Sequence, residues 1–259
     1  MLSLKQRLSS GETIIAAACG RIPSHVIVQM IGMSGHFQAV WLDHEHCGFS
    51  GQQLEVMALA ARATGLESFV RLAPTDYAAV TRCLEAGAGG VMGAMIHNAA
   101  QAEEFVRWAK FHPEGNRGLN NGGYDGKFGG LPLAAFAKNA NENVFVAIQI
   151  ETRGALAEVD AIAAIPGVDL LFVGPADLSQ ALGVTGELFH PECLSAIDAV
   201  AAACKQHGKH WGAVSIGHEH AQMMLGKGCR LLSPANDVRL LQVALGVVGE
   251  EIAALKARV

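Results

Sequence analysis

Short apolar runs alternate along the whole chain with longer segments in which apolar residues recur at helical spacing. The short runs predict strands at Thr13–Ala18, Ala39–Asp43, Ser68–Arg71, Gly90–Met92, Val144–Ile150, Leu170–Gly174, Gly212–Ser215 and Leu231–Ser233. The longer segments predict helices at Ser24–Met33, Gln52–Thr64, Asp76–Ala86, Ala99–Phe111, Arg153–Ala164, Glu192–His207, Glu219–Lys227 and Val238–Arg258, with an additional helix at Pro132–Asn139. This alternation is typical of βα units that share a parallel sheet, and eight such units predict an α/β fold, the (β/α)8 TIM barrel.

The length and composition of the chain fit one such domain. It has 259 residues, of which 51% are hydrophobic and 17% charged, and a TIM barrel typically needs about 250 residues. No linker or sequence repeat interrupts the pattern, so we expect a single domain over residues 1–259. The last predicted helix, 238–258, ends this domain, and Asp237 is expected to cap it.

Charge and cysteine content narrow the possible partners. The formal net charge is −5 and no block of lysine or arginine is present, which argues against nucleic acid as a partner. No run approaches the roughly 20 apolar residues of a membrane span. The six cysteines show no C-x-x-C spacing, as expected for free thiols in a reducing compartment. We therefore expect a soluble cytoplasmic protein without a membrane segment.

A glycine-rich segment, 117–130 (RGLNNGGYDGKFGG), has neither a helical nor a strand period. Six of its fourteen residues are glycine, so its backbone is expected to be flexible. Long loops in compact domains are frequently lids or binding loops, although a plain surface excursion has the same composition. Of the two interpretations, we favour a lid or binding loop.

Polar side chains follow several predicted strands at the points where the strands end. They are Asp43, His44, Glu45 and His46 after the second strand, Arg71 at the third, Gln149 and Glu151 at the fifth, and Asp177 after the sixth. The carboxyl ends of the strands in a parallel barrel converge on one face, where catalytic groups gather. We therefore expect these side chains to lie together at the mouth of the barrel.

Two of these groups predict a divalent-metal site. Gln149 and Glu151 are two residues apart on a strand, so their side chains point to the same face. Asp177 adds a second carboxylate from the neighbouring strand, giving a sparse set of hard oxygen ligands that leaves room for water and substrate, as Mg²⁺ and Mn²⁺ sites do. Taken singly, Glu151 could start a helix and Asp177 could cap one. Together they predict a metal held by Glu151 and Asp177.

The segment after the sixth strand predicts an anion site beside this metal. Gly174, Pro175 and Ala176 open a helical turn, which leaves the backbone N–H groups of Ala176 and Asp177 free for an anion. A carboxylate can bind there while the adjacent keto oxygen meets the metal. Gly174, Ala176 and Asp177 are therefore expected to bind a 2-oxo acid.

An ordered set of segments, covering most of the chain, resembles the HpcH/HpaI family of metal-dependent pyruvate aldolases, in the phosphoenolpyruvate/pyruvate barrel superfamily. The segments are WLDHEH (41–46), VRL (70–72), CLEAGAGGVMGAM (83–95), PEGNRG (113–118), QIET (149–152), GVDLLFVGPADLS (167–179), HPE (190–192) and SPANDVRLL (233–241). The resemblance implies a class II aldolase, related to those that act on 4-hydroxy-2-oxoheptanedioate or 2-dehydro-3-deoxyglucarate. It also implies roles for Glu151 and Asp177 as metal ligands, Gln149 beside the metal, Arg71 on the keto oxygen and His46 in an acid–base dyad.

The same resemblance suggests two further residues of the site. Glu85 stands where other members of the family carry the aspartate of the dyad, fourteen residues after Arg71, and differs from it by one methylene group. Val214, at the end of the seventh strand, is expected to form an apolar wall near the substrate. His46 suits the role of base because the pKa of an imidazole lies near neutrality, and His44 is its rival. The usual proline after the EH pair is replaced by Cys47 here. The resemblance therefore does not identify the aldehyde substrate.

These residues predict a lyase that cleaves or forms 4-hydroxy-2-oxo acids from a pyruvate enolate and an aldehyde, with Mg²⁺, Mn²⁺ or Co²⁺ as cofactor. A Schiff-base aldolase would need a lysine at a strand end, and none of the predicted strands ends in one. A decarboxylase of oxaloacetate, an acyl-CoA lyase and a non-catalytic 2-oxo-acid-binding protein stay as alternatives on the same site. The resemblance further implies a homo-oligomer, a trimer or hexamer, with the last helix packed on a neighbouring subunit.

Overall fold

The computed structural model describes residues 2–257 and shows a closed barrel of parallel strands in sequential order. Strand β1 pairs with β8 and closes the sheet, and each other strand pairs with the next one in sequence. The predicted TIM barrel and all its strands are confirmed, with ends that shift by at most three residues. The strands are β1 (Ile14–Cys19), β2 (Ala39–Asp43), β3 (Glu67–Leu72), β4 (Gly90–Gly93), β5 (Phe145–Ile150), β6 (Leu170–Val173), β7 (His210–Val214) and β8 (Leu231–Asn236).

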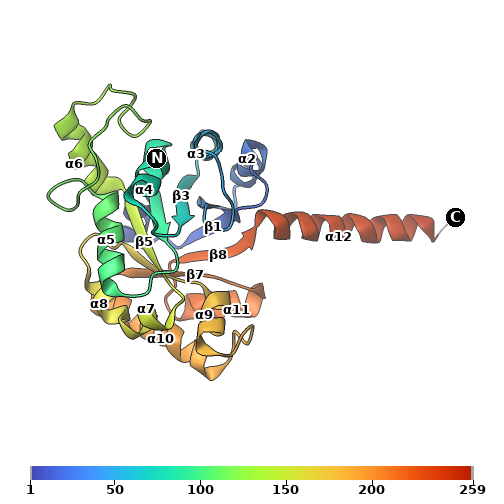
Figure 1. Cartoon of the computed structure of the whole chain (residues 1–259). Coiled ribbons are helices and arrows are strands. Elements are labelled where there is room, and N and C mark those ends of the chain that lie inside the picture. The colour runs from blue at the N-terminus through green and yellow to red at the C-terminus, as the bar shows by residue number, and fades with distance from the viewer. Residues whose placement is uncertain (1, 258–259) are drawn as a thin grey trace.

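Helices surround the barrel and follow the predicted order, with three differences (Figure 1). A short helix, α1, precedes the first strand, the predicted helix 153–164 is divided at Glu158, and a helix of eight residues, α9, begins at Pro175. The helices are α1 (Leu4–Ser9), α2 (His25–Met33), α3 (Gly51–Ala63), α4 (Tyr77–Glu85), α5 (Ala99–Ala109), α6 (Leu133–Asn143), α7 (Arg153–Ala157), α8 (Val159–Ala164), α9 (Pro175–Leu182), α10 (Pro191–Gln206), α11 (Gly217–Gly226) and α12 (Asp237–Lys256).

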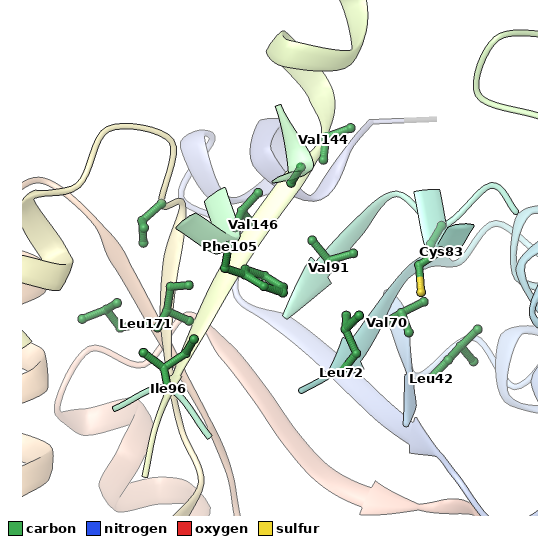
Figure 2. Close-up of a cluster of buried hydrophobic side chains, with 14 of the residues drawn as sticks. Leu42, Val70, Leu72, Cys83, Val91, Ile96, Phe105, Val144, Val146 and Leu171 are labelled. Carbon is green, nitrogen blue, oxygen red and sulfur yellow. The ribbon is translucent and has the colours of Figure 1, made fainter. Parts of the chain in front are cut away.

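Apolar side chains fill two regions, one inside the barrel and one between the strands and the helices. Inside, aromatic rings from the other strands pack opposite the small alanines of β1, and Phe69 meets Phe145 edge to face at 5.6 Å between ring centroids. Leu4 and Leu8 of α1 belong to the same cluster and close the amino end. Figure 2 shows part of the outer region, where Phe105 of α5 packs among aliphatic side chains of the sheet. The interior of the barrel is thus a packed core and not a channel.

One charged side chain is fully buried at the amino end of the barrel. The Nζ atom of Lys110, with 0% exposure, donates to the carbonyl oxygens of Asn141 at 2.9 Å and Val144 at 2.8 Å. Burial lowers the pKa of Lys110 to about 8. The Asn141 side chain in turn bonds the backbone N–H and carbonyl of Phe111, at 2.8 and 2.9 Å. This network joins α5, α6 and the start of β5, so its role is structural.

The glycine-rich segment 117–130 lies at this amino end and cannot cover the mouth of its own barrel. It connects α5 to α6 and packs on the last turn of α4, where the backbone N–H of Tyr124 donates to the Glu85 carbonyl at 2.9 Å. The Arg62 guanidinium stacks 3.5 Å from the centre of the Tyr124 ring. The prediction of a lid is therefore wrong within one chain, because the segment follows a helix and not a strand, and so emerges on the opposite face.

The last helix, α12, extends away from the barrel as a single rod (Figure 1). Asn236 caps it, and Asp237 is the only buried residue along it within the described part of the chain. Large apolar side chains are exposed on α12, namely Leu241, Val243, Leu245, Val247, Val248, Ile252 and Leu255. Residue 258, the predicted end of this helix, lies outside the described residues. None of the helices described is both long and apolar enough to cross a membrane.

Candidate active site

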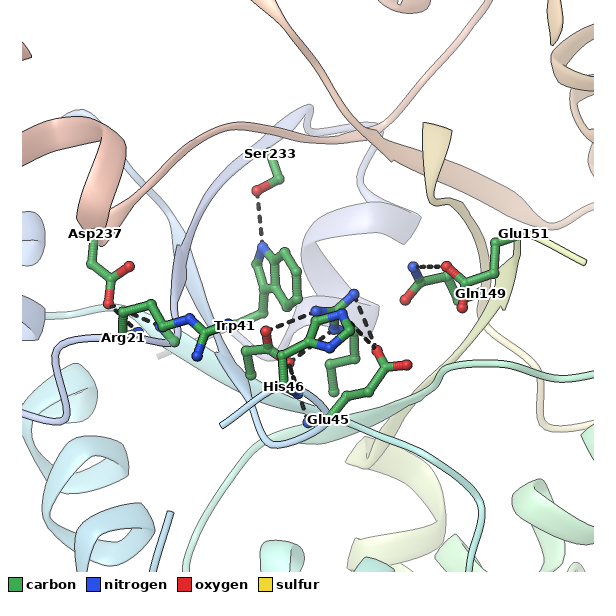
Figure 3. A network of polar contacts seen from close by, with 11 residues as sticks. Arg21, Trp41, Glu45, His46, Gln149, Glu151, Ser233 and Asp237 are labelled. Atoms are coloured by element: carbon green, nitrogen blue, oxygen red, sulfur yellow. Dashed lines mark hydrogen bonds and ion pairs between the residues drawn. The ribbon is translucent and has the colours of Figure 1, made fainter. Parts of the chain in front are cut away.

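The polar side chains predicted for the strand ends come together at the carboxyl end of the barrel (Figure 3). Arg71, at the end of β3, donates to both carboxylate oxygens of Asp43 on β2, with Nε to Oδ1 at 3.1 Å and Nη2 to Oδ2 at 2.7 Å. Its Nη1 lies 3.2 Å from the Glu45 carboxylate, and the Trp41 ring lies below the guanidinium at 4.7 Å. Four contacts therefore fix one cation at the mouth.

Asp43 holds Arg71 in this position. Its Oδ1 also accepts the backbone N–H groups of Glu45 and His46, at 3.2 and 3.3 Å. Burial acts to raise the pKa of Asp43, but the hydrogen bonds and charge of Arg71 and the two N–H groups outweigh it and lower that pKa below its usual value. The carboxylate stays ionised and fixes the strand end as well as the arginine.

Gln149 and Glu151 point from β5 into the same region, as predicted, and each is only 2% exposed. One Glu151 oxygen accepts the Met95 backbone N–H at 2.8 Å, and the other accepts the Gln149 amide N–H. The carbonyl oxygen of Gln149 has no hydrogen-bond partner among the described residues. Met95 presents its N–H from a left-handed conformation, with φ of 51°, which bulky residues rarely adopt.

The charge on Glu151 fits a site made for a cation. Burial is the main cause that raises its pKa to about 7, with the neighbouring carboxylates of Glu45 and Asp177 acting in the same direction. The Met95 N–H and the charge of Arg71 oppose that rise. A buried carboxylate that repels its neighbours is relieved by a divalent cation, and the Gln149 oxygen adds a neutral donor.

The donor set is sparse and made of hard oxygen atoms. In residues 2–257 no group of three or more His, Cys, Asp or Glu side chains is arranged to hold a metal. Two carboxylates with an amide oxygen suit a cation that keeps water and substrate oxygens, such as Mg²⁺ or Mn²⁺, better than a closed zinc site. Gly174 shapes this set, because a Cβ there would lie 2.5 Å from both the Gln149 amide nitrogen and a Glu151 oxygen.

The predicted anion site lies at the start of α9. Gly174 is its N-cap and Pro175 its first residue, so Ala176 and Asp177 contribute their N–H groups from the first turn. Such a turn attracts a carboxylate. The charge of Asp177 contributes to the raised pKa of Glu151, so the two carboxylates act on the same region. Binding of substrate by these residues stays a prediction.

His46 stands at the mouth with its side chain 54% exposed. Its nearest carboxylate is Glu45, with 3.8 Å between His46 Nε2 and Glu45 Oε2. Its rival His44 stacks on Phe49, with 6.4 Å between the ring centroids. The Nδ1 atom of His44 is buried and has no hydrogen-bond partner among the described residues. His46 is therefore the more accessible of the two histidines to a substrate.

Glu85 is not part of this constellation within one chain, so a pair between Glu85 and His46 of the same chain does not form, and its role in the dyad stays a prediction. Helix α4 runs back from the carboxyl end of β3, and Glu85 is its last residue, one short turn before β4 begins. Its carboxylate accepts a hydrogen bond from Asn120 at 3.2 Å, at the amino end of the barrel. The predicted helix 76–86 already ends just after Glu85, and a helix that follows a barrel strand runs back to the amino end, so the pattern itself separates Glu85 from the mouth of its own barrel.

A cavity of about 680 Å³ opens beside Arg71, between the ends of β1, β7 and β8. Val214 lines it, as predicted, together with Arg21, Arg239, Ser215 and Ser233. The Trp41 indole N–H donates to the Ser233 hydroxyl at 2.9 Å and forms part of the floor (Figure 3). The space is large enough for a second substrate next to a 2-oxo acid.

Sequence reasoning gave no role to Glu45 and assigned the wrong one to Asp237. Asp237 is not the cap of α12; its Oδ2 accepts the backbone N–H groups of Gly20, Arg21 and Ile22, at 2.9, 2.8 and 2.8 Å. This buried carboxylate ties the loop after β1 to the end of β8. The partners are more than two hundred positions apart, so no local pattern could have revealed them.

Comparison with known proteins identifies the group to which the chain belongs. The profile of the HpcH/HpaI aldolase/citrate lyase family matches residues 39–244. The chain is 32% identical over 230 residues to a 2-dehydro-3,6-dideoxy-6-sulfogluconate aldolase of Pseudomonas putida, covering 89% of this chain and 88% of that protein. It is 32% identical over 242 residues to a hydroxypyruvate/pyruvate aldolase of Pseudomonas aeruginosa, covering 93% and 89%.

A solved structure agrees with these sequence matches. The fold superposes on the crystal structure of an HpcH/HpaI aldolase from Desulfitobacterium hafniense with a TM-score of 0.90, 27% identity and 97% of each chain covered. The predicted family, fold class and aldolase activity are thereby confirmed. With its parallel barrel and its polar strand ends, the chain belongs to the HpcH/HpaI aldolase/citrate lyase family and is an enzyme of the aldolase type.

Proposed function

We propose that this aldolase forms and cleaves 4-hydroxy-2-oxo acids through a pyruvate enolate and an aldehyde. The observation that carries the proposal is the pairing of an anchored cation, Arg71, with the buried donor set of Gln149 and Glu151, close enough for the charges of Arg71 and Glu151 to interact. The relative named hydroxypyruvate/pyruvate aldolase supports the keto acid. Pyruvate or a related 2-oxo acid and an aldehyde are therefore the proposed partners.

The residues at the mouth divide the tasks of this reaction among them. Ala176 and Asp177 bind the substrate carboxylate through their N–H groups, and Arg71 stabilises the negative charge that develops on the enolate oxygen. His46 takes the proton from the 4-hydroxyl group as the C3–C4 bond breaks, and returns it to the aldehyde oxygen in the direction of addition. Glu151 and Asp177 would hold a divalent cation, Mg²⁺, Mn²⁺ or Co²⁺, which supplies Lewis-acid polarisation of the 2-oxo group when bound.

Exchange of the pyruvate methyl protons in D₂O tests the enolate step without any aldehyde. We expect exchange, followed by NMR, to stop when the protein is stripped with a chelator and to return on adding Mg²⁺, Mn²⁺ or Co²⁺ one at a time. Undiminished exchange in the stripped protein, or a lysine adduct trapped by borohydride, would overturn the proposal. An aldehyde panel with pyruvate then identifies the second substrate, and turnover of oxaloacetate without any aldehyde addition would indicate a decarboxylase instead.

We also infer that the enzyme is a homo-oligomer, a trimer or a hexamer. The exposed apolar side chains of α12, such as Leu245 at 62% and Leu255 at 65%, support a helix that packs on a neighbouring subunit. Glu85 lies at the opposite end of its own barrel from His46, so it can reach a histidine only in another subunit. Light scattering during gel filtration measures the assembly, and a monomer at micromolar concentration would contradict it.

The state of the thiols supports a proposal for the cellular location. All six cysteines are free, and five of them are buried. Burial raises the pKa of Cys83, Cys204 and Cys229 to about 12, which keeps these thiols protonated and unreactive. Free thiols of this kind support a reducing compartment, and we propose the cytoplasm. Fractionation of the native cells tests this location.

A further inference from the structure

The cavity beside Arg71 carries unpaired positive charge at the end farther from the keto-acid site. Arg21 and Arg239 line it, and within residues 2–257 neither guanidinium forms an ion pair or a hydrogen bond. The two carboxylates of the lining are already engaged, since Asp43 is paired with Arg71 and Asp237 Oδ2 accepts three backbone N–H groups. The lining thus carries three arginines against two carboxylates, and neither Arg21 nor Arg239 is paired with one of these carboxylates.

Arg21 stands on a rigid base despite its exposed side chain. The backbone of residues 20–22 is fixed by the buried Asp237, which is 2% exposed. From this base the Arg21 side chain extends toward Trp41 and the mouth (Figure 3). Its backbone position is thus set by the barrel, whereas its guanidinium has freedom to meet a ligand. An arginine held in this way favours recognition of an oxyanion through paired N–H donors.

Two hydroxyl groups in the same cavity independently indicate a ligand with oxygen atoms. Ser215 is 4% exposed and lines the cavity, yet its Oγ has no hydrogen-bond partner among the described residues. A buried hydroxyl without a partner is costly, so it calls for a group that binds there. Ser233 accepts from the Trp41 indole and keeps its own hydrogen for donation. Val214 and Ile216 supply the apolar wall between these polar groups.

We propose that Arg21, with Ser215, is the specificity determinant for the second substrate, which is an aldehyde that carries an anionic group. The inference rests on the proposed function, because it takes the 2-oxo acid to lie between Arg71 and α9. The aldehyde carbon then meets the enolate near Arg71, and its carboxylate, phosphate or sulfonate group lies against Arg21 at the outer end of the cavity. Arg239 adds to the positive field from the first turn of α12.

Matched pairs of aldehydes test this proposal with the metal-loaded enzyme and pyruvate. Succinic semialdehyde is compared with pentanal, glyceraldehyde 3-phosphate with glyceraldehyde, and sulfoacetaldehyde with butanal, so that the three arms distinguish carboxylate, phosphate and sulfonate. We expect the wild type to prefer the anionic member of at least one pair by about 10- to 100-fold in kcat/KM, the size of a charged hydrogen bond. Equal values within all three pairs would overturn the proposal.

Substitutions then assign the preference to residues. Arg21→Met should lower kcat/KM for the anionic aldehyde about 10-fold or more, mainly through KM, and should reduce the ratio between the two members of the pair toward one. Arg21→Lys should restore part of that ratio, Ser215→Ala should lower it less, and Arg107→Met, an exposed arginine on α5, serves as the control. Equal loss on both members of the pair would mean a structural role and would overturn the assignment.

The two proposals fail in different ways. Absence of pyruvate methyl exchange in the metal-loaded wild type would overturn the proposed function itself. Exchange without an anionic preference would overturn only the role of Arg21.

Discussion

The network of Lys110 and Asn141 at the amino end of this barrel and the polar side chains at its carboxyl end differ in whether their hydrogen bonds are complete. At the amino end, Lys110 donates to two carbonyl groups and the Asn141 side chain bonds both backbone groups of Phe111. At the carboxyl end, the Gln149 carbonyl and the Ser215 hydroxyl have no partner in the described structure. Complete networks of this kind stabilise a fold, whereas incomplete ones indicate a place for a ligand.

The shifted pKa values have the same main cause at both ends, and the hydrogen bonds separate them. Burial lowers the pKa of Lys110 and the charge of Lys5 adds to this shift, while its Nζ atom donates to two backbone carbonyls. Burial likewise raises the pKa of Glu151, and other carboxylates add to this shift. Glu151 lies beside the unpaired Gln149 carbonyl, as is typical of a functional site, whereas hydrogen bonding to the backbone is typical of a structural network. Substitutions at the two ends should therefore separate activity from stability.

The largest expected effect is that of Glu151→Gln. The amide oxygen can still accept the Met95 N–H, but the cation loses a negative ligand, so we expect kcat to fall by roughly 10²- to 10³-fold. Stability should not fall, because the substitution removes a buried charge. Activity and urea unfolding are measured side by side. Glu142→Gln, at an exposed position of α6, is the control. Loss of stability together with activity would erase the distinction between the two ends.

At the other end, Lys110 should make stability depend on pH. Its pKa is about 8 in the folded protein against a usual value of 10.5, so between these values the unfolded chain binds more protons and stability rises with pH. The full shift corresponds to at most about 3 kcal/mol. Buried thiols such as Cys204, whose pKa is raised to about 12, give the opposite slope between their unfolded and folded pKa values.

The lysine contribution is isolated as the difference between wild type and Lys110→Met, measured by urea unfolding from pH 7.5 to 10.5. The unfolding free energy of the wild type should increase relative to that of Lys110→Met as the pH rises. The variant's rate of pyruvate methyl exchange should stay within about twofold of the wild-type rate at each pH. If the difference in unfolding free energy does not change over this interval, the pKa of the buried amine is not lowered.

Gly174→Ala should have a smaller effect on activity than Glu151→Gln. The added methyl group would meet Gln149 and Glu151 at 2.5 Å, so both must move, and we expect metal affinity to fall by about 10- to 100-fold. Titration with Mn²⁺ by calorimetry measures the change directly. Gly226→Ala on α11, where the new methyl group meets nothing within 4 Å, is the matched control. Unchanged affinity in the first variant would mean that the two side chains do not form the metal site.

The strands and the mouth were predictable because both depend on local patterns. Short apolar runs locate the strands, which are buried on both faces, and the convergence of carboxyl ends places Arg71, Gln149 and Glu151 on one face. The start of α9 was predictable for the same reason, since Gly174 and Pro175 act within one turn.

What could not be predicted depends on contacts between distant segments. The predicted helix 153–164 is broken at Glu158, whose carboxylate accepts the Ala99 N–H of α5 at 2.7 Å. The anchoring by Asp237 is of the same kind, because it depends on how the barrel closes, and this has no local signature. The position of Glu85 differs, since the predicted helix 76–86 already places it at the amino end, and only its partner in the assembly lies beyond the single chain.

The smallest expected effect comes from Ser233, which belongs to both kinds of network. Its hydroxyl accepts from the buried Trp41 indole and also lines the substrate cavity. Ser233→Ala leaves the indole N–H without a partner, so we expect a loss of about 1 to 2 kcal/mol in unfolding free energy. Activity with pyruvate and an aldehyde should change by only about two- to threefold, because the hydroxyl is one of several donors in the cavity.

A double-mutant cycle with Trp41→Phe separates the two roles of Ser233. Removing both partners leaves no unpaired donor, so the double variant should be more stable than the sum of the single losses predicts. Urea unfolding measures all four proteins, and the aldehyde assay is repeated on each. If the losses in stability simply add, the indole is satisfied by water in the single variant, and Ser233 then belongs with the incomplete network at the mouth. If they couple by about 1 kcal/mol, the completed bond at the floor of the cavity stabilises the fold in the way that Lys110 and Asn141 do at the other end.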